Sequence, residues 1–231
     1  MQPQYDLSGY NASTTLSVSS NKVLRNTYMM LGLTMIPTVI GALVGMTMDF
    51  SFMAGSPILS AVIMLAVMFG LFFAINATRN SAMGVVLLLA LTGFMGLMLG
   101  PVLQVALSLK NGGEIVGLAA GGTGAIFLTL AGIATVTKKD FSFMGKFLMV
   151  GIVLLILASL ANLFFQIPAL ALTLSAAAVL LFSAFILYDV SRVVNGGETN
   201  YVMATLAIYL DIYNLFVNLL QLLMALMGER E

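Results

Sequence analysis

Seven long apolar stretches run along the chain, and short polar breaks separate them. The stretches lie near residues 27–48, 58–77, 83–107, 114–136, 146–166, 169–190 and 201–227. Each approaches the roughly 20 apolar residues that an α-helix needs to cross the hydrocarbon core of a membrane. The pattern therefore predicts an all-α integral membrane protein built as a bundle of seven transmembrane helices.

The breaks carry residues that are typical of turns, such as Asn111-Gly112-Gly113 and Asn195-Gly196-Gly197. The weakest break is Gln166-Ile167-Pro168, which predicts a tight hairpin between the fifth and sixth spans. A count of six spans is the alternative at this point. Pro37 and Pro101 fall inside the first and third spans, where the missing N–H and the ring predict kinks.

Glycines recur four residues apart in three of the spans. The first span has Gly41 and Gly45, the third has Gly96 and Gly100, and the fourth has Gly113, Gly117 and Gly121. This spacing lets helix backbones approach closely in lipid. For the fourth span, tight packing is the favoured interpretation, and the lining of a gate or pore is the alternative.

Composition supports a membrane location and excludes several kinds of chemistry. Hydrophobic residues make up 61% of the chain and charged residues 8%, against about 25% charged residues in a typical soluble domain. The net charge is zero and there is no long basic run, which disfavours a nucleic-acid partner. Cysteine and histidine are absent, so disulfides, Cys/His metal sites and a histidine base are excluded. No cofactor is expected.

Charge distribution predicts the domain organisation and the orientation. Residues 1–20 are polar, do not form a cleavable signal peptide and predict a disordered cytoplasmic tail, followed by a single transmembrane domain at 21–231. Seven basic residues lie on the side of the N-terminus and two on the other side. The positive-inside rule therefore places the N-terminus in the cytoplasm and, for seven spans, the C-terminus outside it.

Two acidic residues stand out in the last two spans. Asp189 lies near the cytoplasmic end of the sixth span, and Asp211 lies about ten residues into the seventh. An intramembrane carboxylate is expensive to insert and is a functional candidate by default. Asn214, Asn218 and Gln221 share the helix face of Asp211, which predicts a polar stripe toward the bundle interior. A short loop joins the two spans, so the two aspartates are expected to face each other.

Two carboxylates in a partly dry site cannot easily both ionise, and they are expected to titrate as a coupled pair. The protonated pair would share a hydrogen bond and hold the two helices together. The ionised pair would repel and would attract a hard cation such as calcium, in a transient contact with Asp189 and Asp211. Arg192, one turn beyond Asp189, could instead neutralise it as an (i, i+3) ion pair. A pH-linked switch or cation site and a static structural pair are about equally supported.

The chain resembles the Bax inhibitor (transmembrane Bax-inhibitor-motif) family over nearly its whole length from Lys22 onward, and four segments carry the resemblance most clearly. They are the segments at residues 96–103 (GLMLGPVL), 139–143 (KDFSF), 187–189 (LYD) and 209–216 (YLDIYNLF). The segments at residues 21–28 (NKVLRNTY) and 196–201 (GGETNY) are similar to the bacterial YccA branch.

The resemblance implies two functions of different kinds. Calcium-leak members of the family use a di-aspartyl sensor on the last two helices, and Asp189 and Asp211 match both positions. Those members also carry a latch arginine at the end of the second span; the matching position here is Thr78, with Arg79 adjacent. YccA-type members are substrates and modulators of the membrane protease FtsH, and a polar tail would suit such a partner.

The function expected from the sequence is thus a pH-sensitive calcium or cation leak in a bacterial inner membrane, with FtsH modulation as the alternative. An enzyme is not expected. Aspartyl intramembrane proteases also use two carboxylates, but they have a glycine beside the second aspartate, whereas Leu210 and Ile212 flank Asp211. Supporting roles are expected for Arg79, Arg192, Asn214 and Asn218. The sequence leaves the oligomeric state open.

Overall fold

A computed structural model describes residues 8–51 and 55–228, with the backbone alone for residues 8–20, 57 and 58. The helices are α1 (Ser8–Thr47), α3 (Pro57–Thr78), α4 (Ala82–Met98), α5 (Gly100–Leu107), α6 (Gly112–Thr137), α7 (Gly145–Phe165), α8 (Pro168–Val194) and α9 (Tyr201–Met227). A 3₁₀ turn, η1 (Ser142–Met144), precedes α7.

Seven helical segments of the described chain are long and apolar enough to cross a membrane, with α4 and α5 together forming one of them. The prediction of seven spans is confirmed, and the six-span alternative is wrong. Gln166 ends α7 in the left-handed region (φ 51°), and Pro168 opens α8. The backbone N–H of Ile167 donates to Asn162 Oδ1 at 3.0 Å. Asn162 and Gln166 thus build a tight hairpin at this end of the bundle.

The two prolines differ in their effect on the helices. Pro37 lies inside the continuous helix α1. Pro101 follows the break at Leu99 and occupies the first turn of α5, where its missing N–H removes no intrahelical hydrogen bond. The third span is therefore divided, as its proline predicts.

Helix α1 begins at Ser8, inside the stretch for which the composition predicts a disordered tail. No proline lies between Pro3 and Pro37, so nothing in the covalent chain forbids a helical backbone there. Residues 1–7 lie outside the described residues.

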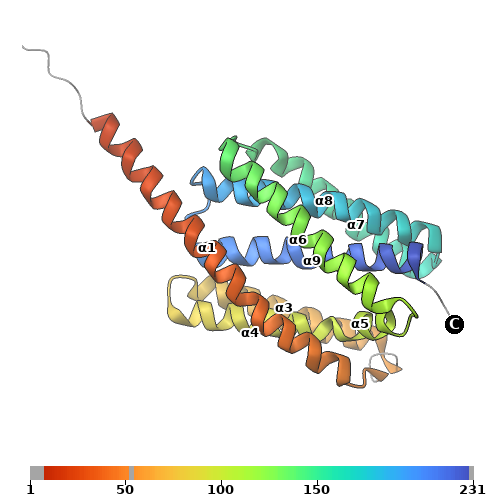
Figure 1. Ribbon diagram of the computed structural model, residues 1–231. Coiled ribbons are helices and arrows are strands. Elements are labelled where there is room, and N and C mark those ends of the chain that lie inside the picture. Colours follow the sequence, from red (N-terminus) through yellow and green to blue (C-terminus); the bar gives the residue numbers. More distant parts are fainter. Residues whose placement is uncertain (1–7, 52–54, 229–231) are drawn as a thin grey trace, which may run out of the picture.

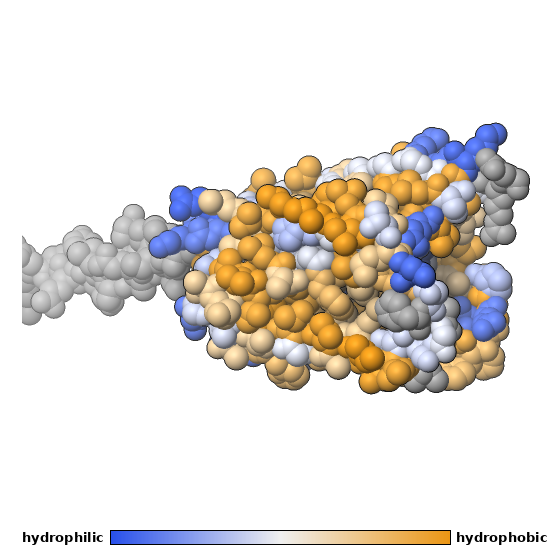
Figure 2. All heavy atoms as spheres, turned by 90° about the horizontal axis from the view of Figure 1, so that it is seen from below, coloured by the Kyte–Doolittle hydropathy of each residue, from blue (hydrophilic) through white to orange (hydrophobic). Residues whose placement is uncertain are grey.

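Helix α9 occupies the centre of the bundle (Figure 1) and packs against α1, α4, α6 and α8. Helix α3 packs outside on α4, and α7 packs outside on α8. Large apolar side chains on the outer faces are exposed, for example Phe73 at 74% and Phe164 at 82%. One face of the molecule shows this apolar surface between more hydrophilic ends (Figure 2). Such a surface is suited to lipid hydrocarbon.

The glycine pairs of α1 and α4 bring the two backbones together, as predicted. A Cβ on Gly96 would lie 2.1 Å from the carbonyl oxygen of Thr38, and a Cβ on Gly41 would lie 2.2 Å from that of Gly93. The glycines of α6 behave differently. A Cβ on Gly117 or Gly121 would meet no described atom within 4 Å. Tight packing is therefore the wrong interpretation for this part of α6.

Candidate functional site

The turn between α8 and α9 positions the two acidic side chains. Gly196 adopts a positive φ of 76°, which a residue with a Cβ rarely does. Asn200 caps α9, accepting hydrogen bonds from the N–H groups of Val202 (3.0 Å) and Met203 (3.1 Å). Its Nδ2 also donates to Asn80 Oδ1 at 2.8 Å. The beginning of α9 is thereby tied to the α3–α4 turn.

Asp189 on α8 and Asp211 on α9 meet between the two helices, with their carboxyl groups within hydrogen-bond reach. Asp211 is 5% exposed and the side chain of Asp189 is 13% exposed. Within the described part of the chain, Oδ2 of Asp211 is enclosed and receives no hydrogen bond from an N–H or O–H donor. Ionised carboxylates only accept hydrogen bonds, so a bond between the two requires a shared proton.

Arg192 is the cation that reaches this pair. Its Nη1 lies 3.3 Å from Asp189 Oδ1, and its Nη2 lies 3.9 Å from Glu198 Oε2. The guanidinium also sits 5.6 Å from the centre of the Tyr188 ring. The (i, i+3) ion pair that the sequence offered as an alternative is therefore present. It neutralises Asp189 in part and leaves Asp211 without a cationic partner among the described residues.

Arg79 lies at the end of α3, and the structure does not bring it to the acidic pair. Its side chain is exposed, and within the described residues it forms no ion pair. Its carbonyl oxygen accepts a hydrogen bond from Asn200 Nδ2 at 3.1 Å. Arg79 thus touches the α8–α9 turn through its backbone.

The polar stripe of α9 follows the side of the helix that faces α8. At its far end, Gln221 Oε1 accepts a hydrogen bond from Ser175 Oγ of α8 at 3.4 Å. Between the two ends, Asn214 donates to the carbonyl oxygen of Leu210, and Asn218 donates to that of Asn214, both at 2.8 Å. These amides are turned onto their own helix.

An apolar row on α8 lies opposite these two amides. Ala178, Phe182 and Ile186 follow Ser175 at spacings of three and four residues and lead to Asp189, so all five share one face. Both ends of this face contact the α9 stripe, which places the three apolar side chains against its middle. They are 1%, 9% and 0% exposed. This apolar plug, Ala178 with Phe182 and Ile186, separates the polar positions at the two ends.

Sequence reasoning missed the apolar plug because apolar residues do not stand out in an apolar span. A usable signal was present in the polar residues at the two ends. If α8 and α9 are paired antiparallel so that Asp189 meets Asp211 and Ser175 meets Gln221, the residues between Ser175 and Asp189 on that face must cover the middle of the α9 stripe.

A resident metal ion does not fit the acidic pair. No group of three or more acidic, histidine or cysteine side chains is clustered among the described residues. Calcium takes six to eight oxygen ligands, whereas two carboxylates supply four at most, and one of these oxygens already binds Arg192.

The fold and the site define a multi-pass, all-helical membrane protein with an acidic pair between its last two helices. The chain belongs to the Bax inhibitor family: the family's sequence profile, described as "Inhibitor of apoptosis-promoting Bax1", matches residues 20–228.

Relatives are similar over nearly their whole length. An uncharacterized protein of Neisseria meningitidis is 43% identical over 98% of this chain and 99% of its own. "Modulator of FtsH protease YccA" of Escherichia coli is 41% identical over 90% of this chain and 92% of its own. An uncharacterized protein of Pseudomonas aeruginosa is 42% identical over 96% of both chains. The resemblance to the YccA branch is confirmed.

Proposed function

We propose that this protein is a pH-sensitive leak pathway for calcium or other cations, gated by Asp189 and Asp211. The observation that carries the proposal is the enclosed contact of two carboxyl groups across the α8–α9 interface. A carboxyl pair in this position changes from a link between two helices to a source of repulsion when it loses its shared proton.

Electrostatic repulsion between the two ionised carboxylates would weaken the α8–α9 interface. Two unit charges about 4 Å apart repel by roughly 4 kcal/mol at an effective dielectric constant of about 20. The charged groups that face the pair are Arg192, which offsets part of this repulsion, and Glu198, which opposes that offset. Arg192 is bound to Asp189 and not to Asp211, so the charge that enters with ionisation of Asp211 is poorly compensated.

Opening gives the polar stripe of α9 access to water. The apolar plug is buried against the middle of that stripe, an arrangement that supports the proposal of a path closed at this point. Separation of α8 from α9 would free the amides of Asn214 and Asn218 to bind a passing cation or its water shell. The ionised carboxylates would attract that cation at the end that carries Arg192.

We further propose that this end faces the cytoplasm of a bacterial cell and that the membrane is the inner membrane. Seven of the nine basic residues lie on the side of the N-terminus, in agreement with the positive-inside rule. A second Escherichia coli relative, 41% identical, carries the name "Inner membrane protein YccA".

The test is calcium entry into liposomes that contain the purified protein, measured with an enclosed dye between about pH 5 and about pH 8. Entry is expected to rise with pH in the wild-type protein and to lose this dependence in Asp189→Asn and Asp211→Asn. Asp140→Asn is the matched control, because it removes the same charge from an exposed position at the same end of the bundle. A wild-type pH response in both pair variants would refute the gating role.

A second candidate function is modulation of the protease FtsH. It rests on the 41% identity with a protein named as such a modulator. The two functions are compatible, because an acidic pair inside the bundle leaves the N-terminal tail, which we place in the cytoplasm, available to a partner.

The tail tests this second function. We expect that deletion of residues 2–20 slows the turnover of the protein in cells that contain FtsH and has no effect in cells depleted of it. A tail of the same length and composition in scrambled order is the control for length alone. Equal turnover of the full-length and shortened proteins would exclude the tail as the point of contact.

A further inference from the structure

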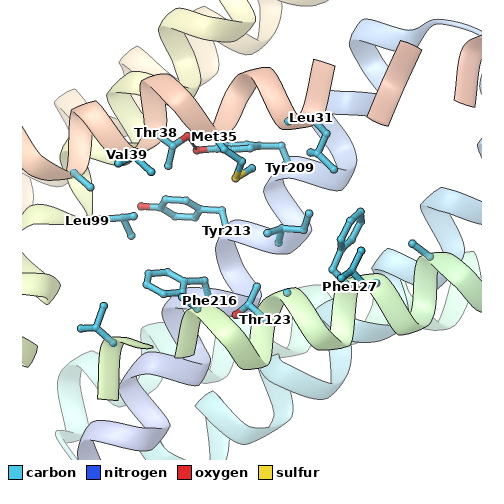
Figure 3. A pocket seen from close by; sticks show the side chains of 18 of the residues that line it. Leu31, Met35, Thr38, Val39, Leu99, Thr123, Phe127, Tyr209, Tyr213 and Phe216 are labelled. Carbon is cyan, nitrogen blue, oxygen red and sulfur yellow. Dashed lines mark hydrogen bonds between the residues drawn. The ribbon is translucent and has the colours of Figure 1, made fainter. Parts of the chain in front are cut away.

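A deep groove separates α1 from α6, on the side of α9 away from the acidic pair. Its volume is about 960 Å³, with α9 as its floor and, at one end, Leu99 of the α4–α5 break with Leu103 and Leu107 of α5. At the other end, Tyr28 on α1 meets α6 through a 3.2 Å hydrogen bond to Thr135 and an edge-on contact with Phe127. Figure 3 shows Met35 and Val39 on one side of the space and Thr123 and Phe127 on the other. We call this space the α1–α6 groove.

The groove has the length of a membrane's hydrocarbon core. On α1 it extends from Tyr28 to Met46, which is about 27 Å at 1.5 Å per residue, against about 30 Å for the core. Gly32, Gly124 and Gly132 line it, and a Cβ on any of them would meet no described atom within 4 Å. The glycines of α1 and α6 here leave open space between the helices.

The lining requires no polar ligand. Thr38 Oγ1 and Tyr209 OH are hydrogen-bonded at 2.8 Å, and Tyr213 OH donates to the carbonyl oxygen of Met95 at 3.1 Å. Thr123 Oγ1 has no hydrogen-bond partner among the described residues, but it is enclosed by protein and does not face the open space. The other lining side chains are almost all apolar. The α1–α6 groove is therefore suited to binding a hydrocarbon group.

The groove opens toward the lipid. Val39 and Leu43 on its α1 side are 56% and 55% exposed, and Leu128 and Val136 on its α6 side are 70% and 81% exposed. These residues line the groove and belong to spans whose outer faces meet lipid. The hydrocarbon groups that can enter the groove from the membrane are thus the acyl chains of lipids.

Four exposed cations flank the closed end of the groove. Arg25 lies one turn beyond Tyr28 on α1, with Lys22 a further turn away, and Lys138 and Lys139 follow Thr135 at the end of α6. Asp140 is the nearby acid in sequence. Ser142 donates two hydrogen bonds to its carboxylate and so lowers the pKa of Asp140, which stays ionised. The four cations still outnumber it.

We propose that the α1–α6 groove binds the acyl chains of an anionic phospholipid, with the lipid phosphate between these basic residues of α1 and α6. The groove and the basic residues then bind two parts of the same lipid. The acyl chains fill the apolar space, and the cations prefer a negatively charged headgroup. The site stands apart from the acidic pair, so its test is independent of the gating proposal.

The test is native mass spectrometry of the purified full-length protein in detergent, titrated with phosphatidylglycerol or with phosphatidylcholine of the same acyl chains. Phosphatidylglycerol is expected to bind more tightly, by about fivefold for each basic residue that meets the phosphate. Glycerol phosphate, which lacks the chains, is expected not to bind. Equal affinity for the two lipids would overturn the assignment of the headgroup, and binding of glycerol phosphate alone would overturn the role of the groove.

Variants locate the site. Gly124→Leu and Gly132→Leu each place a side chain in the groove and are expected to lower phosphatidylglycerol binding at least about tenfold. Gly121→Leu is the matched control, because Gly121 has the same free space but does not line the groove. Wild-type affinity in both groove variants would show that lipid binds elsewhere.

The headgroup contact has its own pair of variants. Arg25→Gln combined with Lys138→Gln is expected to lower the preference for phosphatidylglycerol over phosphatidylcholine, by about fivefold for each of the two residues that meets the phosphate. Lys146→Gln, an exposed cation at the same end of the bundle, is expected to leave it intact. Retention of the preference in the double variant would contradict the proposed position of the phosphate.

Discussion

The close contact between α1 and α4 predicts opposite effects for two glycine-to-alanine substitutions. In Gly96→Ala, the new Cβ would lie 2.1 Å from the carbonyl oxygen of Thr38. Carbon and oxygen atoms without a covalent bond normally stay about 3.3 Å or more apart, so the helices would have to separate by about 1 Å. The obstacle is backbone, which cannot move aside by rotating a side chain. Gly70 on α3 has no described atom within 4 Å of an added Cβ and is the matched control.

The magnitude follows from two terms. Alanine is favoured over glycine in a helix by about 0.8–1.0 kcal/mol, and this gain is similar in both variants. Gly70→Ala should therefore be slightly more stable than wild type. Gly96→Ala adds an overpacking penalty of about 1–3 kcal/mol. It also strains the 2.8 Å hydrogen bond by which Thr38 holds Tyr209 of α9.

The assay is unfolding in mixed micelles of dodecyl maltoside and sodium dodecyl sulfate, followed by circular dichroism. The free energy of unfolding of Gly96→Ala should fall below that of Gly70→Ala by about 1–3 kcal/mol. Equal stability of the two variants would refute the close approach of α1 and α4.

Three further predictions concern other parts of the bundle. Phe182→Ala should raise calcium entry at low pH several-fold, because it removes the largest side chain of the apolar plug between water and the polar stripe. Phe164→Ala, at a position 82% exposed, should leave calcium entry unchanged. Equal calcium entry in the two variants would exclude a role of the apolar plug in closing the path. Asn200→Ala removes the cap of α9 and should lower the free energy of unfolding by about 1 kcal/mol, which the same micelle titration would detect or exclude. Hydrogen bonds from Ser142 lower the pKa of Asp140 below its ordinary 3.8. The stability that Asp140 contributes is therefore present above about pH 3.8 and lost as the pH falls through the folded pKa. The difference in melting temperature between wild type and Asp140→Asn should accordingly vanish in acid, and a difference that grows in acid would contradict this sign.

The spans and the acidic pair could be predicted from the sequence because the membrane imposes simple requirements. A helix must be apolar over about 20 residues to cross the hydrocarbon core of a membrane, so the seven spans can be found from the apolar stretches alone. Carboxylates are rare in such stretches, so Asp189 and Asp211 stand out without any knowledge of the fold. A short loop between two spans makes them antiparallel neighbours, and that was enough to bring the pair together.

The surroundings of the pair depended in part on information that a single sequence does not contain. Arg192 lies one turn from Asp189 on the same helix, so their ion pair could be predicted from the spacing. That Arg79 stays away from the acidic pair could not, because it depends on where α3 packs in the bundle. The glycines of α6 have the same spacing as those of α1 and α4, yet they border open space. Glycines four residues apart place a row of residues without side chains on one face of a helix. The positions of the neighbouring helices decide whether another backbone packs against that face.

The most direct test of the account is a reversible link between α8 and α9. The chain has no cysteine, so Ser175→Cys and Gln221→Cys, at two positions in contact at the far end of the interface, would supply the only thiols. A short bifunctional methanethiosulfonate would join them, and dithiothreitol would release them. If ionisation of the pair opens a path by separating the two helices, the linked protein should lose the rise of calcium entry with pH and regain it on reduction. The same pH-dependent entry in the linked and the reduced protein would contradict a path between α8 and α9.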